Sequence, residues 1–277
     1  MRTLQLPGGD TVPVLGQGTW FMGEDASARA EEIRALQTGV DLGLALIDTA
    51  EVYGNGRAEE LVGEAIAGRR DDVFIVSKVL PSNASRKGTV EACERSLKRL
   101  KTDVIDMYLL HWQGAYPFME TIAGMMNLLE AGKIRHWGVS NMDVAEMDDI
   151  FSFAEGRSCA VNQILYNLSR RGVEYDLLPW CTGERLAVMA YSPVEQGRIL
   201  ENQTLCAIAE RHNATPARIA LAWVLENPRL MAIPKAGKAE HVRENSKCLE
   251  IVFTPEDLRE LDAAFPPPKR KEPLEML

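Results

Sequence analysis

The chain reads Leu-Ile-Asp-Thr-Ala-Glu-Val-Tyr-Gly from Leu46 to Gly54, and this stretch decides the fold. An apolar run stops abruptly at Asp48, and Tyr53 follows in a loop punctuated by Gly54 and Gly56. A short apolar run bounded by turn signals is typical of a buried strand with a loop at its carboxyl end. In barrels that alternate strands and helices, chemistry takes place at that end of the strands. Other strands of such a barrel would bring their last residues to the same rim.

Outward from this stretch, apolar strands alternate with amphipathic helices. A Gly-rich hairpin over residues 3–14 precedes a first barrel strand, Val14–Trp20, whose glycines would let a ligand approach the backbone. The other strands are expected to end at Asp48 and to span 73–78, 105–111, 133–140, 159–163, 186–193 and 230–233. Helices are expected over 28–42, 58–67, 89–100, 119–131, 144–153, 175–182, 204–212, 216–225, 240–248 and 255–264. Eight such βα units predict an α/β fold, a (β/α)8 TIM barrel with an N-terminal hairpin and two extra helices, in one domain over residues 1–277.

Composition narrows the class of protein. The net charge of −9 argues against nucleic acid or an anionic membrane as a partner, although a few lysines can still bind a phosphorylated ligand. The five cysteines are widely separated and show no metal-ligand spacing, so we expect reduced thiols and no metal site. With neither a signal peptide nor an apolar run of about 20 residues, we expect a cytoplasmic protein that is a monomer or weak oligomer.

Seven of the expected strands end on polar residues. In order these are Asp48, Lys78, His111, Ser140-Asn141, Gln163, Tyr191-Ser192 and Lys235. Each has an ordinary explanation when taken alone: Asp48 can cap the next helix, and His111 can be a packed or surface histidine. A barrel would bring all seven to one cavity, and this convergence indicates a functional site more strongly than any single member.

Four of the side chains suit the reduction of a carbonyl group. A tyrosine has an unperturbed pKa of about 10, and an ammonium within about 4–6 Å would lower it by about 1–3 units. We therefore expect Lys78 to acidify Tyr53, with Asp48 holding Lys78 charged. His111 can donate a hydrogen bond to the oxygen that receives the proton.

The polar residues at the other strand ends imply a bound cofactor that donates a hydride. Ser140, Asn141 and Gln163 can hydrogen-bond a nicotinamide carboxamide, and Tyr191 can stack on the nicotinamide ring. After the last strand, Lys235, Lys238, His241 and Arg243 form a basic cluster in an acidic chain. This cluster can be a solvated helix start, but its position favours a nucleotide phosphate site.

The sequence resembles the aldo-keto reductases. The match runs in order along almost the whole chain and consists of Gly18-Thr19-Trp20, Asp48, Tyr53, Lys78, His111, Gly138-Val139-Ser140-Asn141, Gln163, Tyr191-Ser192-Pro193 and Ile233-Pro234-Lys235. The resemblance implies NADPH-dependent reduction of aldehydes and ketones, with Tyr53 as general acid assisted by Lys78 and Asp48. It also implies pyrophosphate contacts from Ser192, Val194 and Gln196, and adenine contacts from Glu244 and Asn245.

Two departures from the family pattern affect the cofactor. Ala236 stands where many members carry Ser or Thr, and His241 stands where an arginine usually grips the 2′-phosphate. Both weaken recognition of that phosphate, so NADPH is expected as the cofactor with NADH as an alternative.

The segment after His111 is short, as in bacterial short-loop members of the family, some of which act on methylglyoxal. We expect a shallow, open pocket for small aldehydes, lined by Trp20, Trp112 and Tyr116 beside Tyr53 and His111.

Two other functions fit parts of the pattern. Lys78 can act as the nucleophile of a Schiff-base aldolase or lyase, which requires a lysine with a depressed pKa in an apolar pocket. The chain can also be a nucleotide-binding regulatory subunit with little turnover, although the intact set of four residues argues against this. Gly54-Asn55-Gly56 lacks the remaining glycine of a dinucleotide fingerprint, so it does not favour a Rossmann fold.

Overall fold

The computed structural model describes residues 1–277. A two-stranded antiparallel hairpin, β1 (Thr3–Gln5) and β2 (Thr11–Pro13), comes first. The barrel strands are β3 (Gln17–Gly18), β4 (Leu46–Asp48), β5 (Phe74–Val79), β6 (Ile105–Leu110), β7 (Ile134–Ser140), β8 (Val161–Leu165), β9 (Ala187–Tyr191) and β10 (Leu230–Ala232). The helices are α1 (Arg29–Asp41), α2 (Arg57–Ala65), α3 (Arg86–Leu100), α4 (Phe118–Glu130), α5 (Val144–Ser152), α6 (Leu177–Gly183), α7 (Gln203–Arg211), α8 (Pro216–Val224), α9 (Ala239–Ser246) and α10 (Pro255–Ala264).

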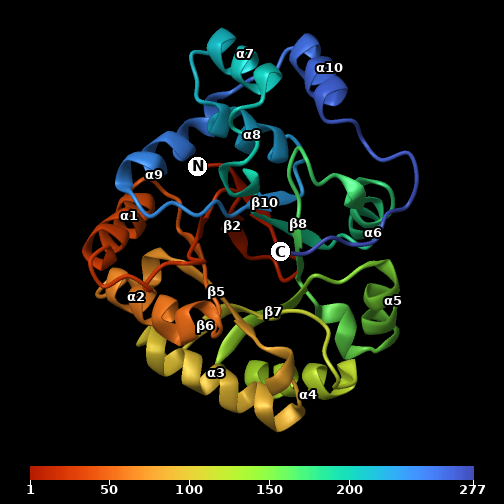
Figure 1. The fold of residues 1–277 in the computed structure, drawn as a ribbon. Helices are drawn as coiled ribbons and strands as arrows, with labels where there is room; N and C mark the ends of the chain where they lie inside the picture. The colour runs from red at the N-terminus through yellow and green to blue at the C-terminus, as the bar shows by residue number, and fades with distance from the viewer.

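The eight barrel strands are parallel and follow one another in chain order from β3 to β10. Two parallel bridges, Leu15 to Ala232 and Gly18 to Lys235, join the first strand region to the last and close the ring. The helices surround the strands (Figure 1). The expected (β/α)8 barrel with its hairpin and extra helices is therefore confirmed, with boundaries shifted by a few residues.

The first strand is shorter than expected, because only Gln17 and Gly18 of the predicted Val14–Trp20 strand have strand geometry. Its glycines also have a reason other than a ligand. A Cβ at Gly16 would lie 2.7 Å from the side chain of Leu46, and one at Gly18 would lie 2.7 Å from the carbonyl oxygen of Ile233. Both contacts are with neighbouring strands, so the glycines allow the strands to close the barrel.

A single cluster of 73 buried residues forms the hydrophobic core. Every residue of β6 is buried, which is typical of a parallel strand covered on both faces. Helix ends are fixed by the side chains of Ser85, Asp143, Asn202 and Thr254, each of which accepts a backbone N–H. None of the helices has the length and hydropathy required to span a bilayer.

The segment after α10 does not extend away from the barrel. It runs back along α6 and brings the C-terminus over the centre of the ring (Figure 1). Lys271 forms ion pairs with Asp143 (3.2 Å) and Asp176 (2.8 Å) on the way. The backbone N–H of Leu277 donates to the hydroxyl of Tyr191 at 3.4 Å. This segment therefore contributes to the rim where the predicted site lies.

Candidate active site

A buried ion pair lies at the carboxyl ends of β4 and β5. Lys78 Nζ is 2.8 Å from both carboxylate oxygens of Asp48 and donates to the carbonyl oxygen of Thr49 at 3.0 Å. The side chains of Lys78 and Asp48 are 0% and 3% exposed. Burial raises the pKa of Asp48 and lowers that of Lys78, and the attraction between the two charges opposes both shifts.

Tyr53 completes this group. Its hydroxyl is 3.2 Å from Lys78 Nζ, which also lies 4.9 Å from the centre of the tyrosine ring. Tyr53 begins a short 3-10 turn, Tyr53–Gly56, in which Gly54, Asn55 and Gly56 all have positive φ. This turn starts α2 directly after the loop and fixes the position of the phenol, so three of the four predicted catalytic side chains meet.

The expected acidification of Tyr53 is wrong for the protein alone. Burial, followed by the carboxylate of Asp48, raises the pKa of the Tyr53 phenol well above its ordinary value near 10. The physical reason is that Asp48 largely cancels the field of the Lys78 ammonium, while desolvation disfavours the phenolate. The site therefore keeps the proton on Tyr53.

His111, directly after β6, is the fourth member. Its ring packs edge-on against Tyr53 with the centroids 5.7 Å apart, and the ring of Trp112 lies 4.8 Å away. Burial, together with the nearby Lys78 ammonium, lowers the pKa of His111 to about 2. The imidazole is neutral at physiological pH, so it can donate or accept a hydrogen bond but cannot serve as the acid. Its Nδ1 is buried without a hydrogen-bond partner.

The residues predicted to hold a nicotinamide continue around the same rim. Gln163 Nε2 donates to Asp48 Oδ1 at 2.8 Å, which joins β8 to the ion pair. Asn141 Nδ2 donates to the carbonyl oxygen of His111 (3.1 Å), and Tyr191 Oη donates to Asn141 Oδ1 (2.9 Å). Ser140 Oγ donates to the carbonyl oxygen of Gln163 at 2.9 Å. These predicted cofactor contacts therefore form one continuous arc with the four catalytic candidates.

Two residues of the Gly18-Thr19-Trp20 motif have visible roles. Thr19 is fully buried and binds the carbonyl oxygen of Asp48 through both its N–H and its hydroxyl, each at 3.0 Å. It therefore fixes the end of β4, from which the loop to Tyr53 starts. Trp20 is half-buried and stacks on Phe21 with the centroids 4.5 Å apart. Tyr116 is 41% exposed, and residues 112–117 contain no helix or strand.

The loop after β9 has strained backbone angles and is held by several side-chain contacts. Ser192, Glu195 and Gln196 have left-handed φ angles of 47°, 48° and 56°. Such strain persists only where the surroundings enforce it, and it gathers at binding sites. Ser192 and Gln196 were predicted from the family resemblance to follow a pyrophosphate, together with Val194.

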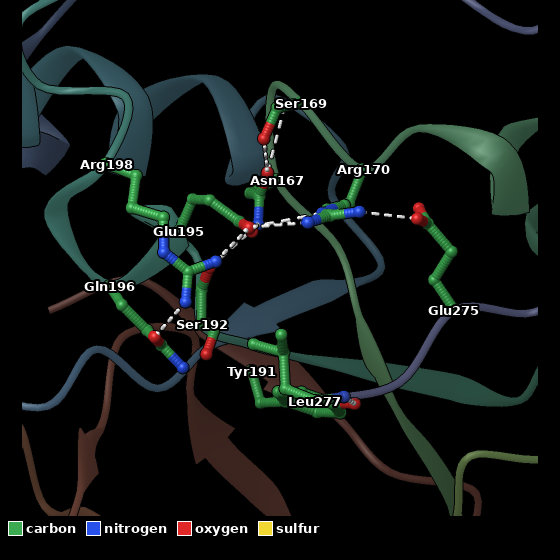
Figure 2. A network of polar contacts seen from close by, with 10 residues as sticks. All are labelled: Asn167, Ser169, Arg170, Tyr191, Ser192, Glu195, Gln196, Arg198, Glu275 and Leu277. Atoms are coloured by element: carbon green, nitrogen blue, oxygen red, sulfur yellow. Dashed lines mark hydrogen bonds and ion pairs between the residues drawn. The ribbon is translucent and has the colours of Figure 1, made fainter.

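Glu195, which no sequence pattern singled out, is the central acceptor of the side-chain contacts that hold this loop (Figure 2). Its buried carboxylate accepts hydrogen bonds from Asn167 (2.8 Å), Arg170 (2.9 Å) and Arg198 (3.0 Å). Arg170 also binds Glu275 of the C-terminal segment. A charged residue between two predicted contact residues was the available signal, but two of its three partners, Asn167 and Arg170, lie on the loop after β8.

The predicted phosphate and adenine residues lie beside β10 and on α9. Lys235, Lys238 and His241 are exposed, which leaves their side chains accessible to a phosphate. Glu244 is paired with Lys247 at 2.6 Å, and Asn245 is 9% exposed. Exposed lysine side chains therefore lie at the β10 end of the arc, and the amide groups and an aromatic ring lie at the ends of the preceding strands, β7 to β9. This donor set fits a dinucleotide carrying a nicotinamide.

Comparison with known proteins agrees with this geometry. The family model described as "Aldo/keto reductase family" matches residues 14–265. The chain is 50% identical to methylglyoxal reductase YeaE of Escherichia coli over 100% of this chain and 99% of the relative. It is 34% identical to a glyoxal reductase of Bacillus subtilis, over 94% of this chain and 92% of the relative.

Solved structures agree as well. An aldo-keto reductase from Klebsiella pneumoniae, crystallised in complex with NADPH, superposes with a TM-score of 0.97 at 48% identity and covers 100% of this chain and 99% of its own. The barrel, the rim of candidate side chains and these matches lead to one conclusion: the chain belongs to the aldo-keto reductase family.

Proposed function

We propose that this protein reduces small aldehydes and ketones, including methylglyoxal and other 2-oxoaldehydes, to alcohols with NADPH. The observation that carries the proposal is the buried chain of contacts from Asp48 through Lys78 to the Tyr53 hydroxyl. The two bacterial relatives named above, a methylglyoxal reductase and a glyoxal reductase, support the substrate class.

Bound NADPH supplies the hydride that reduces the carbonyl carbon. Tyr53 donates its proton to the carbonyl oxygen, and its raised pKa keeps that proton in place until an alkoxide, a much stronger base than a phenolate, begins to form. The Lys78 ammonium already hydrogen-bonds the Tyr53 oxygen at 3.2 Å, so it stabilises the phenolate that remains. Asp48 keeps Lys78 charged in a place where burial disfavours the charge.

His111 orients the substrate. Because the imidazole is neutral, it has one N–H to donate to the carbonyl oxygen and adds no charge that would compete with Tyr53 for the proton-donor role. Ring contacts with Tyr53 and Trp112 limit the rotation of the imidazole.

For the cofactor we propose contacts along the arc described above. Ser140, Asn141 and Gln163 would bind the carboxamide and Tyr191 would stack on the ring. Gly18, Thr19, Trp20, Ser192, Val194 and Gln196 would line the path of the cofactor, Lys235, Lys238 and His241 would hold the 2′-phosphate, and Glu244 and Asn245 would contact adenine.

The short segment after His111 supports a pocket for small substrates. Trp20, Trp112 and Tyr116 would line it, and no helix or strand is inserted between His111 and α4. We also propose a cytoplasmic location, which the five free thiols support, and a monomer or weak oligomer without a nucleic-acid partner, which the net charge of −9 supports.

The test is turnover of NADPH and NADH with methylglyoxal and a panel of small aldehydes, with Tyr53→Phe as the matched variant. This change keeps the ring and removes only the proton donor. We expect kcat to fall by about 10²–10⁴-fold while NADPH binding, followed by fluorescence titration, is retained. A variant with near-normal turnover would refute the assignment of Tyr53, and borohydride trapping of substrate on Lys78 would support the Schiff-base alternative.

A further inference from the structure

Glu51 lies between Asp48 and Tyr53 on the loop after β4, and its carboxylate is directed to a different loop. Oε1 accepts hydrogen bonds from the backbone N–H of Leu80 (2.7 Å) and from Asn83 Nδ2 (2.9 Å). Oε2 lies 3.6 Å from Arg95 Nη2 on α3, and the Glu51 side chain is only 7% exposed. All its side-chain partners therefore belong to the segment that follows the Lys78 strand.

These contacts join the loop that carries the proton donor to the segment that follows β5, the strand that carries the ammonium. Leu80 follows Lys78 by two residues, and Tyr53 follows Glu51 by two. The backbone N–H of Glu51 also points to the carbonyl oxygen of Lys78, at 3.4 Å. Hydrogen bonds from a backbone N–H to a carboxylate are stronger than neutral ones, and a buried carboxylate without them would be costly. Glu51 thus binds the Lys78 segment through both its main chain and its side chain.

A third loop packs against the same place. A Cβ at Gly114 would lie only 2.5 Å from Cβ of Pro81, the residue after Leu80. The short segment after His111, which carries Trp112 and Tyr116, therefore rests on the turn that Glu51 holds. A shift of this turn would displace the substrate side of the pocket together with the end of β5.

We propose that Glu51 is a positioning residue that sets the distance between the Tyr53 hydroxyl and Lys78 Nζ. The Asp48–Lys78 pair fixes the ammonium, but Asp48 precedes the loop and its side chain makes no contact that holds residues 51–53 against β5. Glu51 supplies the missing constraint. This inference rests on the catalytic roles proposed above for Tyr53 and Lys78.

The experiment compares Glu51→Ala, Glu51→Gln and Arg95→Gln in the full-length protein with methylglyoxal and NADPH. Misplacement of a catalytic group by about 1 Å can cost about 100-fold in rate, so we expect Glu51→Ala to lower kcat by about 10- to 100-fold. The dissociation constant for NADPH should change by less than about twofold, because the proposed cofactor contacts lie on other strands. Glu51→Gln keeps an acceptor for the Leu80 N–H and should recover part of the loss. Arg95→Gln removes only the longer contact to a half-exposed side chain and should behave like the wild type.

The isotope effect on kcat separates misplacement of the catalytic groups from a loss of stability alone. With NADPH deuterated at the hydride-donating position, Glu51→Ala should show a larger isotope effect on kcat, because the chemical step becomes slower relative to product release. Activity is measured well below each variant's melting temperature. If Glu51→Ala does not fold, Asn83→Ala, which removes one of the two donors to Oε1, should show the same trend with a smaller amplitude.

The proposal is overturned if folded Glu51→Ala, or Asn83→Ala in its place, has the wild-type kcat and isotope effect. Tyr53→Phe is measured in parallel. An active Tyr53→Phe would refute the proposed function itself, whereas an inactive Tyr53→Phe beside a fully active Glu51→Ala would refute only the role of Glu51.

Discussion

The buried pair of Asp48 and Lys78 allows a quantitative test by a double-mutant cycle. Asp48→Asn preserves the shape of the side chain but removes the charge that lies 2.8 Å from an ammonium with no exposed surface. Removing one partner of a buried pair costs about 3–5 kcal/mol, because the other charge is left without compensation. We expect the free energy of unfolding to fall by this amount in Asp48→Asn, and by a similar amount in Lys78→Met.

The pH dependence of the two single variants should have opposite signs. In Asp48→Asn, burial holds the pKa of Lys78 below its unfolded value of about 10.4, so the unfolded state binds more protons and stability recovers as pH rises toward that value. In Lys78→Met, burial holds the pKa of Asp48 above its unfolded value of about 3.9, so the folded state binds more protons and stability recovers as pH falls toward about 4. Each unit of pKa difference corresponds to about 1.4 kcal/mol.

The double variant Asp48→Asn/Lys78→Met tests whether the two charges are energetically coupled. It removes both charges of the pair, and replacing a whole buried pair is often close to neutral. We expect it to lose about 1–2 kcal/mol, far less than the sum of the single losses, with little dependence on pH. Urea unfolding followed by tryptophan fluorescence between about pH 5 and pH 9 measures all four proteins. Additive losses, or single variants with parallel pH profiles, would show that the two side chains are not a coupled buried ion pair.

Two further predictions concern pH and cofactor choice. Since the pKa of Tyr53 is raised well above 10 and that of His111 is lowered to about 2, neither group changes protonation near neutrality, and kcat for reduction should be flat between about pH 6 and pH 9; a fall in kcat that begins below about pH 9 would contradict the raised pKa. His241→Arg should increase the NADPH-to-NADH ratio of kcat/KM, because a guanidinium can bind a phosphate through two parallel hydrogen bonds; an unchanged ratio in this variant would exclude position 241 from 2′-phosphate binding.

The meeting of the candidate side chains at one rim could be predicted from the sequence because of one geometric property. In a parallel barrel every strand ends on the same side, so the identity of the last residue of each strand is enough to place Asp48, Lys78 and His111 together. The periodicity of the helices fixed the barrel in the same way, as α10 shows by beginning at Pro255 and ending at Ala264 as expected.

The residues that hold this rim in place could not be predicted in that way. Glu51 and Glu195 lie in loops, and their partners come from segments that no periodic pattern connects with them. The sequence predicts that Gly18 lets a ligand approach the backbone. A Cβ at this position would instead meet the carbonyl oxygen of Ile233, where the first and last strands of the barrel adjoin. Such contacts depend on how the chain closes on itself, and local sequence carries little information about that.

The pKa of Tyr53 shows how contacts that the sequence does not reveal change the expected mechanism. A single ammonium beside a phenol predicts an acidic tyrosine that releases its proton early. A compensated ion pair in a buried site predicts the reverse, because desolvation outweighs the small remaining field. The hydrogen bond from Lys78 then acts mainly on the phenolate, once the proton has left. In the proposed mechanism the Lys78 ammonium therefore stabilises the phenolate charge as it develops, and an interaction that strengthens toward the transition state is what acceleration of that step requires.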